Sequence, residues 1–294
     1  MPYPSSAASI AGSVTLPPTA CPPSATSLPI WPTVRDSYAF VLRRQRELAR
    51  LALPWLLSAL AVGAAGAALG HGEWTWTTAR LLDWLGAMAV TVAWLRLASV
   101  GTPARWGAPL DRGVASLLLR STLVTLLCLL PGGVLALLGS QLASSALPDA
   151  AGQVLGVVVL AGALLAAMYA LMRLQLYVVA GALRVTSLSL ADAWRMMRGH
   201  TARLVAVYLV VSLLGMLVGM VGIALGTGLL LSLLGPEAAQ GFVLPSAGGR
   251  LSGPTLLIEA LVRTLTYGLA ALNATVLAAL ARHVLPTTIA SSAQ

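Results

Sequence analysis

Among the ionisable residues in the long apolar runs of this chain, Arg96, Arg173, Glu259 and Arg263 are the candidates for polar or lipid-headgroup contacts. A charge is costly in such surroundings and is therefore often functional. An arginine placed there either binds an anion or extends its long side chain toward water. Glu259 precedes Arg263 by four residues, a spacing that permits an ion pair along one helix. We expect this pair to be structural, with the gating of a polar path as the alternative.

The runs that hold these residues are long enough to be membrane-spanning helices. Crossing a hydrocarbon layer of about 30 Å takes roughly 20 apolar residues in a helix. The runs that qualify are residues 51–69, 81–100, 114–138, 154–183, 204–234 and 256–280. They lack the alternation of barrel strands. The sequence therefore predicts an all-α, polytopic membrane protein whose six transmembrane helices form one domain over residues 33–286.

Composition excludes a soluble class and a nucleic-acid partner. Of the 294 residues, 58% are hydrophobic and 9% are charged, whereas soluble domains have about 25% charged residues. The net charge of +9 is spread between the apolar runs instead of forming the single basic face that nucleic acid requires. We therefore expect membrane lipids, and no nucleic acid, around this chain.

Arginines cluster in alternate gaps between the runs, and this pattern predicts orientation. Loops rich in arginine stay on the cytoplasmic side. The clusters are Arg35, Arg43, Arg44, Arg46 and Arg50 before the first run, Arg105, Arg112 and Arg120 after the second, Arg184, Arg195, Arg198 and Arg203 after the fourth, and Arg282 after the sixth. We therefore predict a bacterial inner-membrane protein with both termini cytoplasmic, a disordered tail over residues 1–32 and a short tail over residues 287–294.

Two segments carry the signature of amphipathic interfacial helices. Both Thr33-Val34-Arg35-Asp36 and Ser189-Leu190-Ala191-Asp192 match the capping box that opens helices. The apolar positions that follow share one face: Tyr38, Val41, Leu42 and Leu48 after the first box, and Leu190, Trp194 and Met197 at the second. Such helices lie among lipid headgroups. In the second, Arg195 and Arg198 are the predicted headgroup contacts.

Short motifs resemble a known group of bacterial membrane proteins. The residues are Arg173-Leu174, Ser187, Ala193-Trp194 and Arg198-Gly199, followed by a long apolar run. They resemble six-helix integral membrane proteins related to the YciC family, a group that overlaps the membrane domain of some glycerophosphoryl diester phosphodiesterases. Residues 38–54 resemble the start of those proteins. The resemblance implies a six-helix fold and a membrane location more than an activity.

No arrangement of residues in the sequence indicates catalysis. The histidines, His71, His200 and His283, are scattered, and the nine acidic residues show no metal-ligand spacing. We expect no enzyme, metal or cofactor. The leading hypothesis is a non-enzymatic protein with a structural, assembly-related or lipid-interacting role, with membrane lipids and a possible membrane-protein partner; its oligomeric state stays open. The alternative is a transporter or permease subunit for a small or anionic solute, in which Arg96, Arg173, Glu259 and Arg263 face one another across a cavity.

Overall fold

All regular elements in the described part of the chain are helices. The computed structural model describes residues 29–69, 72–102, 106–146, 149–185, 188–234 and 253–285. The predicted tails, apart from residues 29–32, and Arg105 lie outside these ranges. The helices confirm the all-α class.

Six of these helices match the six predicted runs. They are α2 (Gln45–Leu69), α3 (Gly72–Val100), α4 (Arg112–Ala146), α5 (Asp149–Ala182), α7 (Thr201–Leu234) and α9 (Gly253–Val284). Each is long and apolar enough to cross a membrane. The chain is therefore a multi-pass membrane protein. Every one of these helices extends beyond its predicted run at one end or both, because polar residues such as Arg112 and Thr201 continue the helix past the hydrophobic stretch.

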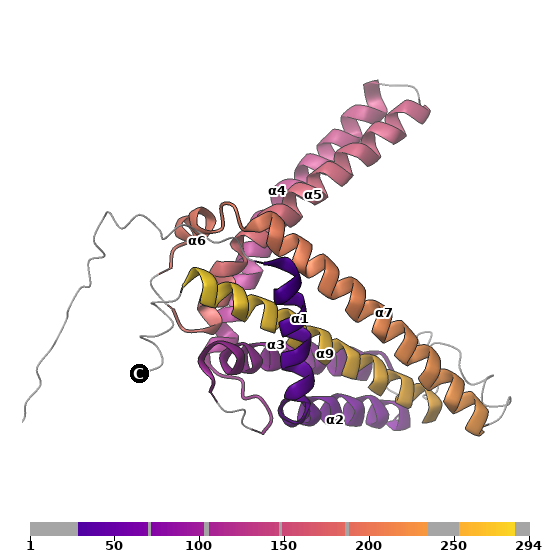
Figure 1. Ribbon diagram of the computed structural model, residues 1–294. Coiled ribbons are helices and arrows are strands. Elements are labelled where there is room, and N and C mark those ends of the chain that lie inside the picture. The colour runs from indigo at the N-terminus through magenta and orange to yellow at the C-terminus, as the bar shows by residue number, and fades with distance from the viewer. Residues whose placement is uncertain are drawn as a thin grey trace, which may run out of the picture.

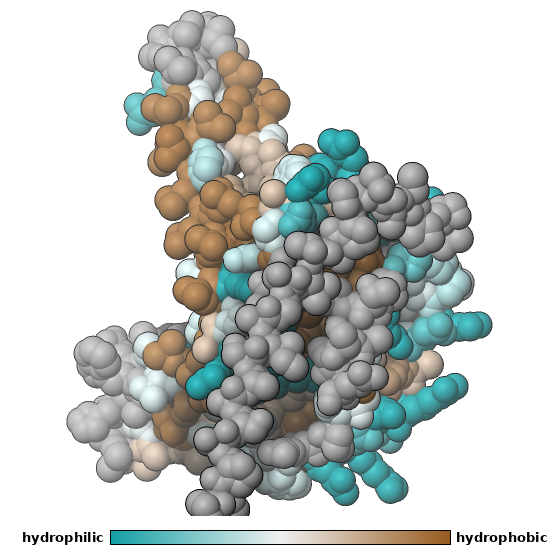
Figure 2. Space-filling model, turned by 90° about the vertical axis from the view of Figure 1, so that its left-hand side faces the viewer, coloured by the Kyte–Doolittle hydropathy of each residue, from teal (hydrophilic) through white to brown (hydrophobic). Residues whose placement is uncertain are grey.

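The six long helices form two groups (Figure 1). Helices α2, α3 and α9 lie side by side, and α7 packs on α9. Helices α4 and α5 pair with each other, and this hairpin projects away from the other four helices. Figure 2 shows this hairpin as an apolar column that rises beside a more hydrophilic surface. Its large apolar side chains, among them Leu119 and Leu165, are exposed, as lipid-facing residues are.

The buried core lies where α3 meets α9. Trp94 of α3 is fully buried, and its indole Nε1 donates a hydrogen bond of 2.9 Å to Oγ1 of Thr275. Gly86 allows α2, α3 and α9 to approach, because a Cβ there would lie 2.6 Å from Oη of Tyr267 and 2.8 Å from Cβ of Trp55. Any larger residue would force these helices apart.

Glycines of α7 face leucines of α9. The sequence pairs Gly215-x-x-x-Gly219 and Gly222-x-x-x-Gly226 predict close helix packing. Added Cβ atoms at positions 215, 219 and 226 would contact Leu269, Leu265 and Leu261 of α9 at 3.1 to 3.5 Å. The prediction is confirmed for these three glycines and wrong for Gly222, which has open space beside it.

Helix α1 (Ile30–Arg43) begins earlier and ends sooner than the sequence predicts. Thr33 does not cap it; Pro29 is the N-cap, and Oγ1 of Thr33 donates to the carbonyl of Pro29 within the helix. The predicted first capping box is therefore wrong. Proline is tolerated in the first turn of a helix, so Pro32 does not prevent the helix from starting at Ile30. Arg44 interrupts the helix, so Leu48 belongs to α2.

Helix α1 crosses the long helices instead of continuing α2 (Figure 1). It contacts α9 and α7. The ring of Phe40 meets Trp94 edge to face at 5.7 Å, and the Tyr38 hydroxyl donates to the carbonyl of Val211 in α7 at 3.0 Å. These contacts fix α1 near the arginine-bearing ends of α3 and α7.

Helix α6 (Leu190–Met196) starts as the sequence predicts. Oγ of Ser189 accepts the backbone N–H of Asp192 at 3.1 Å, and it donates to the Asp192 carboxylate at 2.5 Å. Gly199 follows in the left-handed conformation, with φ of +88°, which lets the chain turn into α7. Met197, predicted to face lipid, is fully buried in the protein.

Candidate functional site

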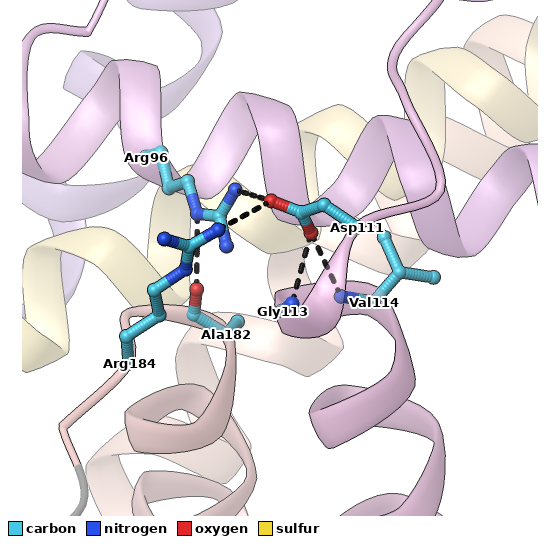
Figure 3. A network of polar contacts seen from close by, with 6 residues as sticks. All are labelled: Arg96, Asp111, Gly113, Val114, Ala182 and Arg184. Atoms are coloured by element: carbon cyan, nitrogen blue, oxygen red, sulfur yellow. Dashed lines mark hydrogen bonds and ion pairs between the residues drawn. The ribbon is translucent and has the colours of Figure 1, made fainter.

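An arginine–aspartate network joins three helix ends that are far apart in the sequence (Figure 3). Arg96, near the end of α3, donates from Nη1 to Oδ2 of Asp111 at 2.5 Å and from Nε to the carbonyl of Ala182 at 3.1 Å. Arg184, just after α5, donates to the same Asp111 oxygen at 3.1 Å. We call Arg96, Asp111 and Arg184 the Asp111 cluster. It ties α3, the start of α4 and the end of α5 together.

Asp111 also opens α4. Its Oδ1 accepts the backbone N–H groups of Gly113 and Val114 at 2.9 and 3.2 Å. Partial burial raises the pKa of this carboxyl, but hydrogen bonds from Arg96 and from these amides, with the charge of Arg96, outweigh burial and lower the pKa to about 2. Because the pKa is lowered by folding, the stability that Asp111 contributes is complete above its ordinary range and is lost as the pH falls toward 2.

Two backbone features, the C-terminal end of α5 and a glycine in α4, position the side chains of the Asp111 cluster. Arg184 adopts a left-handed φ of 61°, a conformation that usually falls to glycine. The amide of Val185 bonds the carbonyl of Ala180, and that of Arg184 bonds Gly181, which is the Schellman ending of a helix. At Gly113 a Cβ would lie 1.9 Å from Nη2 of Arg96, so a larger residue there would displace the guanidinium from its present position.

Arg173 holds α6 against α5. Its Nε donates to the carbonyl of Trp194 at 3.1 Å, and Nη1 donates to the Tyr169 hydroxyl at 3.3 Å. The guanidinium carbon lies 4.1 Å from the centre of the Trp194 ring, a cation–π distance. Arg173 is only 9% exposed. Its side chain therefore neither extends to the membrane surface nor points into an open cavity.

Arg263 forms the predicted pair with Glu259, at 2.9 Å from Nη2. The hydrogen bonds of Arg263 only partly offset the free energy of burying its charge, since its Nη1 has no hydrogen-bond partner in the described structure. The Tyr267 hydroxyl and Oδ1 of Asp83 in α3 are also buried without partners. Asp83 and Arg263 both lie near that hydroxyl. We call Asp83, Glu259, Arg263 and Tyr267 the Tyr267 cluster.

The structure brings only two of the six predicted site residues together. Glu259 and Arg263 form a pair, whereas Arg96 and Arg173 each have separate partners. Arg195 pairs with Asp192 at 2.7 Å, and Arg198 is exposed. The sequence interpretation missed the roles of Asp111, Arg184 and Tyr267. An aspartate two residues before a glycine, ahead of an apolar run, was the available signal for Asp111, because aspartate is a preferred N-cap.

One end of the molecule carries more arginines than its acids can pair. At this arginine-rich end α2, α4 and α7 begin, and α3, α5 and α9 finish. Its four acids are all in ion pairs: Asp36 with Arg35, Glu47 with Arg44, Asp111 with Arg96 and Arg184, and Asp192 with Arg195. The arginines at this end that form neither an ion pair nor a side-chain hydrogen bond with any described residue are Arg43, Arg46, Arg50, Arg112, Arg198, Arg203 and Arg282.

A histidine pair joins the start of α7 to the end of α9. The rings of His200 and His283 lie 5.6 Å apart, edge to face. His200 is 9% exposed, and its Nδ1 has no partner among the described residues. Burial lowers the pKa of His200, and the charges of His283 and Arg203 lower it further.

We predict that acid weakens this junction. Because the folded pKa of His200 lies below its ordinary value of about 6.5, the neutral ring stabilises the fold above that pH, and this contribution declines as the pH falls below it. The melting temperature, followed by tryptophan fluorescence in detergent, should fall between pH 7.5 and 5.5 in the native chain. His200→Gln should reduce this difference. An equal fall in His200→Gln would contradict the assignment.

Fold and site together define a multi-pass α-helical membrane protein with one strongly cationic end. No protein-family model, curated protein or solved structure matches the chain. The function must therefore be inferred from the contacts and charges of the described residues.

Proposed function

We propose that the chain is a non-enzymatic bacterial inner-membrane protein whose arginine-rich end binds anionic phospholipids from the cytoplasmic side. One observation carries this proposal: the four acids at that end are already in ion pairs, while seven arginines there form neither an ion pair nor a side-chain hydrogen bond with a described residue. Positive charges without a partner among the described residues attract anions, and the anionic phosphates of the inner leaflet are the anions nearest to a membrane protein. The resemblance to YciC-like proteins is consistent with this role.

The proposed orientation places both termini in the cytoplasm, with α1 and α6 at the headgroup level. Exposed Trp31 and Leu42 on α1, 67% and 66% accessible, are the apolar groups that would enter the interface. Reporter fusions should place the connection between α5 and α7 in the cytoplasm. A periplasmic location would overturn the orientation.

Lipid dependence tests the proposal. In nanodiscs containing phosphatidylglycerol the protein should melt at a higher temperature than in nanodiscs of phosphatidylcholine alone. The difference should shrink in about 1 M salt, where charges are screened beyond about 3 Å. Equal melting temperatures in the two lipids at low salt would contradict anionic-lipid binding.

A permease role is the second candidate, and the Tyr267 cluster is the observation that favours it. Three buried polar atoms have no hydrogen-bond partner among the described residues and lie on two neighbouring helices, as in a hydrated polar path. The cluster does not include Arg96 or Arg173, each of which is bound elsewhere. Solute flux into proteoliposomes that is abolished by Arg263→Gln in a folded protein would favour this role over the first.

A further inference from the structure

A cavity lies where α1 crosses α9, at the arginine-rich end. Its volume is about 600 Å³, within the range of small-molecule sites. Arg43 and Arg44 of α1 and Arg282 of α9 line it, together with one acid, Asp36. Phe40 and Ala279 add apolar surface. We call this space the α1–α9 cavity.

The charges around the α1–α9 cavity are unequally satisfied. Arg44 pairs with Glu47 at 3.2 Å and lies over the Phe40 ring, and Asp36 pairs with the exposed Arg35. Arg43 and Arg282 form no ion pair with a residue of the described ranges. Among the described residues, the cavity therefore has two guanidinium groups without an ion pair, one from each helix, and a single carboxylate, Asp36, which pairs with Arg35.

Neither flanking segment supplies the missing negative side chain. Residues 1–28, which lead into α1, contain no aspartate or glutamate, and neither do residues 286–294 after α9. These two segments therefore offer no acidic side chain to Arg43 and Arg282, which leaves the pair open to an anion from another molecule. Guanidinium groups are well suited to phosphate, because their planar fork donates two parallel hydrogen bonds.

We propose that the α1–α9 cavity binds the phosphate of an anionic phospholipid, between Arg43 and Arg282. This site deepens the proposed function and rests on it. The apolar surface of Phe40 and Ala279 fits the glycerol and first acyl carbons, and exposed Trp31 and Leu42 on the same helix contact the neighbouring chains. A freely soluble phosphate would use the arginines but gain nothing from these apolar groups.

The test uses the purified full-length protein in detergent and native mass spectrometry. Three probes are added separately: phosphatidylglycerol, phosphatidylcholine and inorganic phosphate. The variant Arg43→Gln/Arg282→Gln removes both cavity arginines. Arg46→Gln/Arg198→Gln removes the same charge from two exposed, unpaired arginines that do not line the cavity.

Phosphatidylglycerol should bind the cavity variant about tenfold more weakly than the native chain, as expected for the loss of charge-assisted hydrogen bonds. The control variant removes part of the general positive surface but leaves both cavity arginines, so it should lose clearly less affinity for phosphatidylglycerol than the cavity variant. If the two variants lose affinity equally, the cavity is overturned while general anionic-lipid binding stands. If the native chain does not prefer phosphatidylglycerol to phosphatidylcholine, both proposals fail. If inorganic phosphate binds as tightly as the lipid, the site is one for a soluble anion.

A conservative variant covers the case in which the double glutamine chain does not fold. Arg43→Lys/Arg282→Lys keeps both charges but loses the planar forks. It should show intermediate affinity for phosphatidylglycerol with an unchanged melting temperature in detergent. Native affinity in this variant would overturn recognition by the paired guanidinium groups.

Discussion

Asp111→Asn is expected to destabilise the protein by about 2 kcal/mol, within the range for losing a hydrogen bond between charged groups, because the Asp111 and Arg96 side chains are only partly buried. Asparagine still accepts backbone N–H groups and remains a good N-cap, so the start of α4 survives. The substitution removes the ion pairs of Asp111 with Arg96 and Arg184, whose guanidinium groups would then have no opposite charge beside them. The free energy of unfolding in mixed micelles, from tryptophan fluorescence, measures the effect.

Two further variants decide whether the ion pair is responsible. Asp36→Asn removes the same charge from an exposed pair in which both side chains are more than two thirds accessible, and it should change stability little. Adding Arg96→Met to Asp111→Asn should restore part of the loss, because an apolar side chain needs no counter-charge. A double variant less stable than Asp111→Asn alone would show that the arginine contributes by other contacts.

The transmembrane helices were predictable because their signal is local. The length and apolar composition of each run indicate that it lies in lipid. Because backbone groups in lipid must bond within their own segment, a run such as residues 154–183 forms a helix independently of its neighbours. The position of α1 was not predictable in the same way. Its buried positions include Thr33 and Ser37, whose hydroxyls bond to the preceding turn, and no hydrophobic periodicity marks them as a packing face.

The candidate site was predictable only where its partners are close in sequence. The spacing of Glu259 and Arg263 indicated their ion pair, and the box from Ser189 to Asp192 indicated the cap of α6. Asp111 meets Arg184 across 73 residues, and that contact depends on how α4 and α5 return to one end. The sequence indicated that burying the charge of Arg96 is unfavourable, but it did not indicate that Asp111 and the Ala182 carbonyl are its partners.

Arg173 joins elements 21 residues apart, and its loss is expected to release α6. The guanidinium gives one hydrogen bond to the Trp194 carbonyl, another to the Tyr169 hydroxyl and a cation–π contact to the Trp194 ring. The Tyr169 bond lies within α5, whereas the two contacts to Trp194 join α5 to α6 and stabilise the docked α6 by about 3 kcal/mol, or roughly two orders of magnitude in its equilibrium. Arg173→Met keeps the apolar stem but makes none of these polar contacts.

Limited trypsin digestion reports the docking of α6. In Arg173→Met, cleavage after Arg195 and Arg198 should be much faster than in the native chain, because an undocked helix exposes its backbone to protease. Arg50→Met is the matched control, since Arg50 is exposed and forms no ion pair with a described residue; cleavage in α6 should stay at the native rate. Equal acceleration in both variants would mean that arginine loss loosens the whole molecule. An unchanged rate in Arg173→Met would mean that Met197 and the core around it, not Arg173, hold α6 in place.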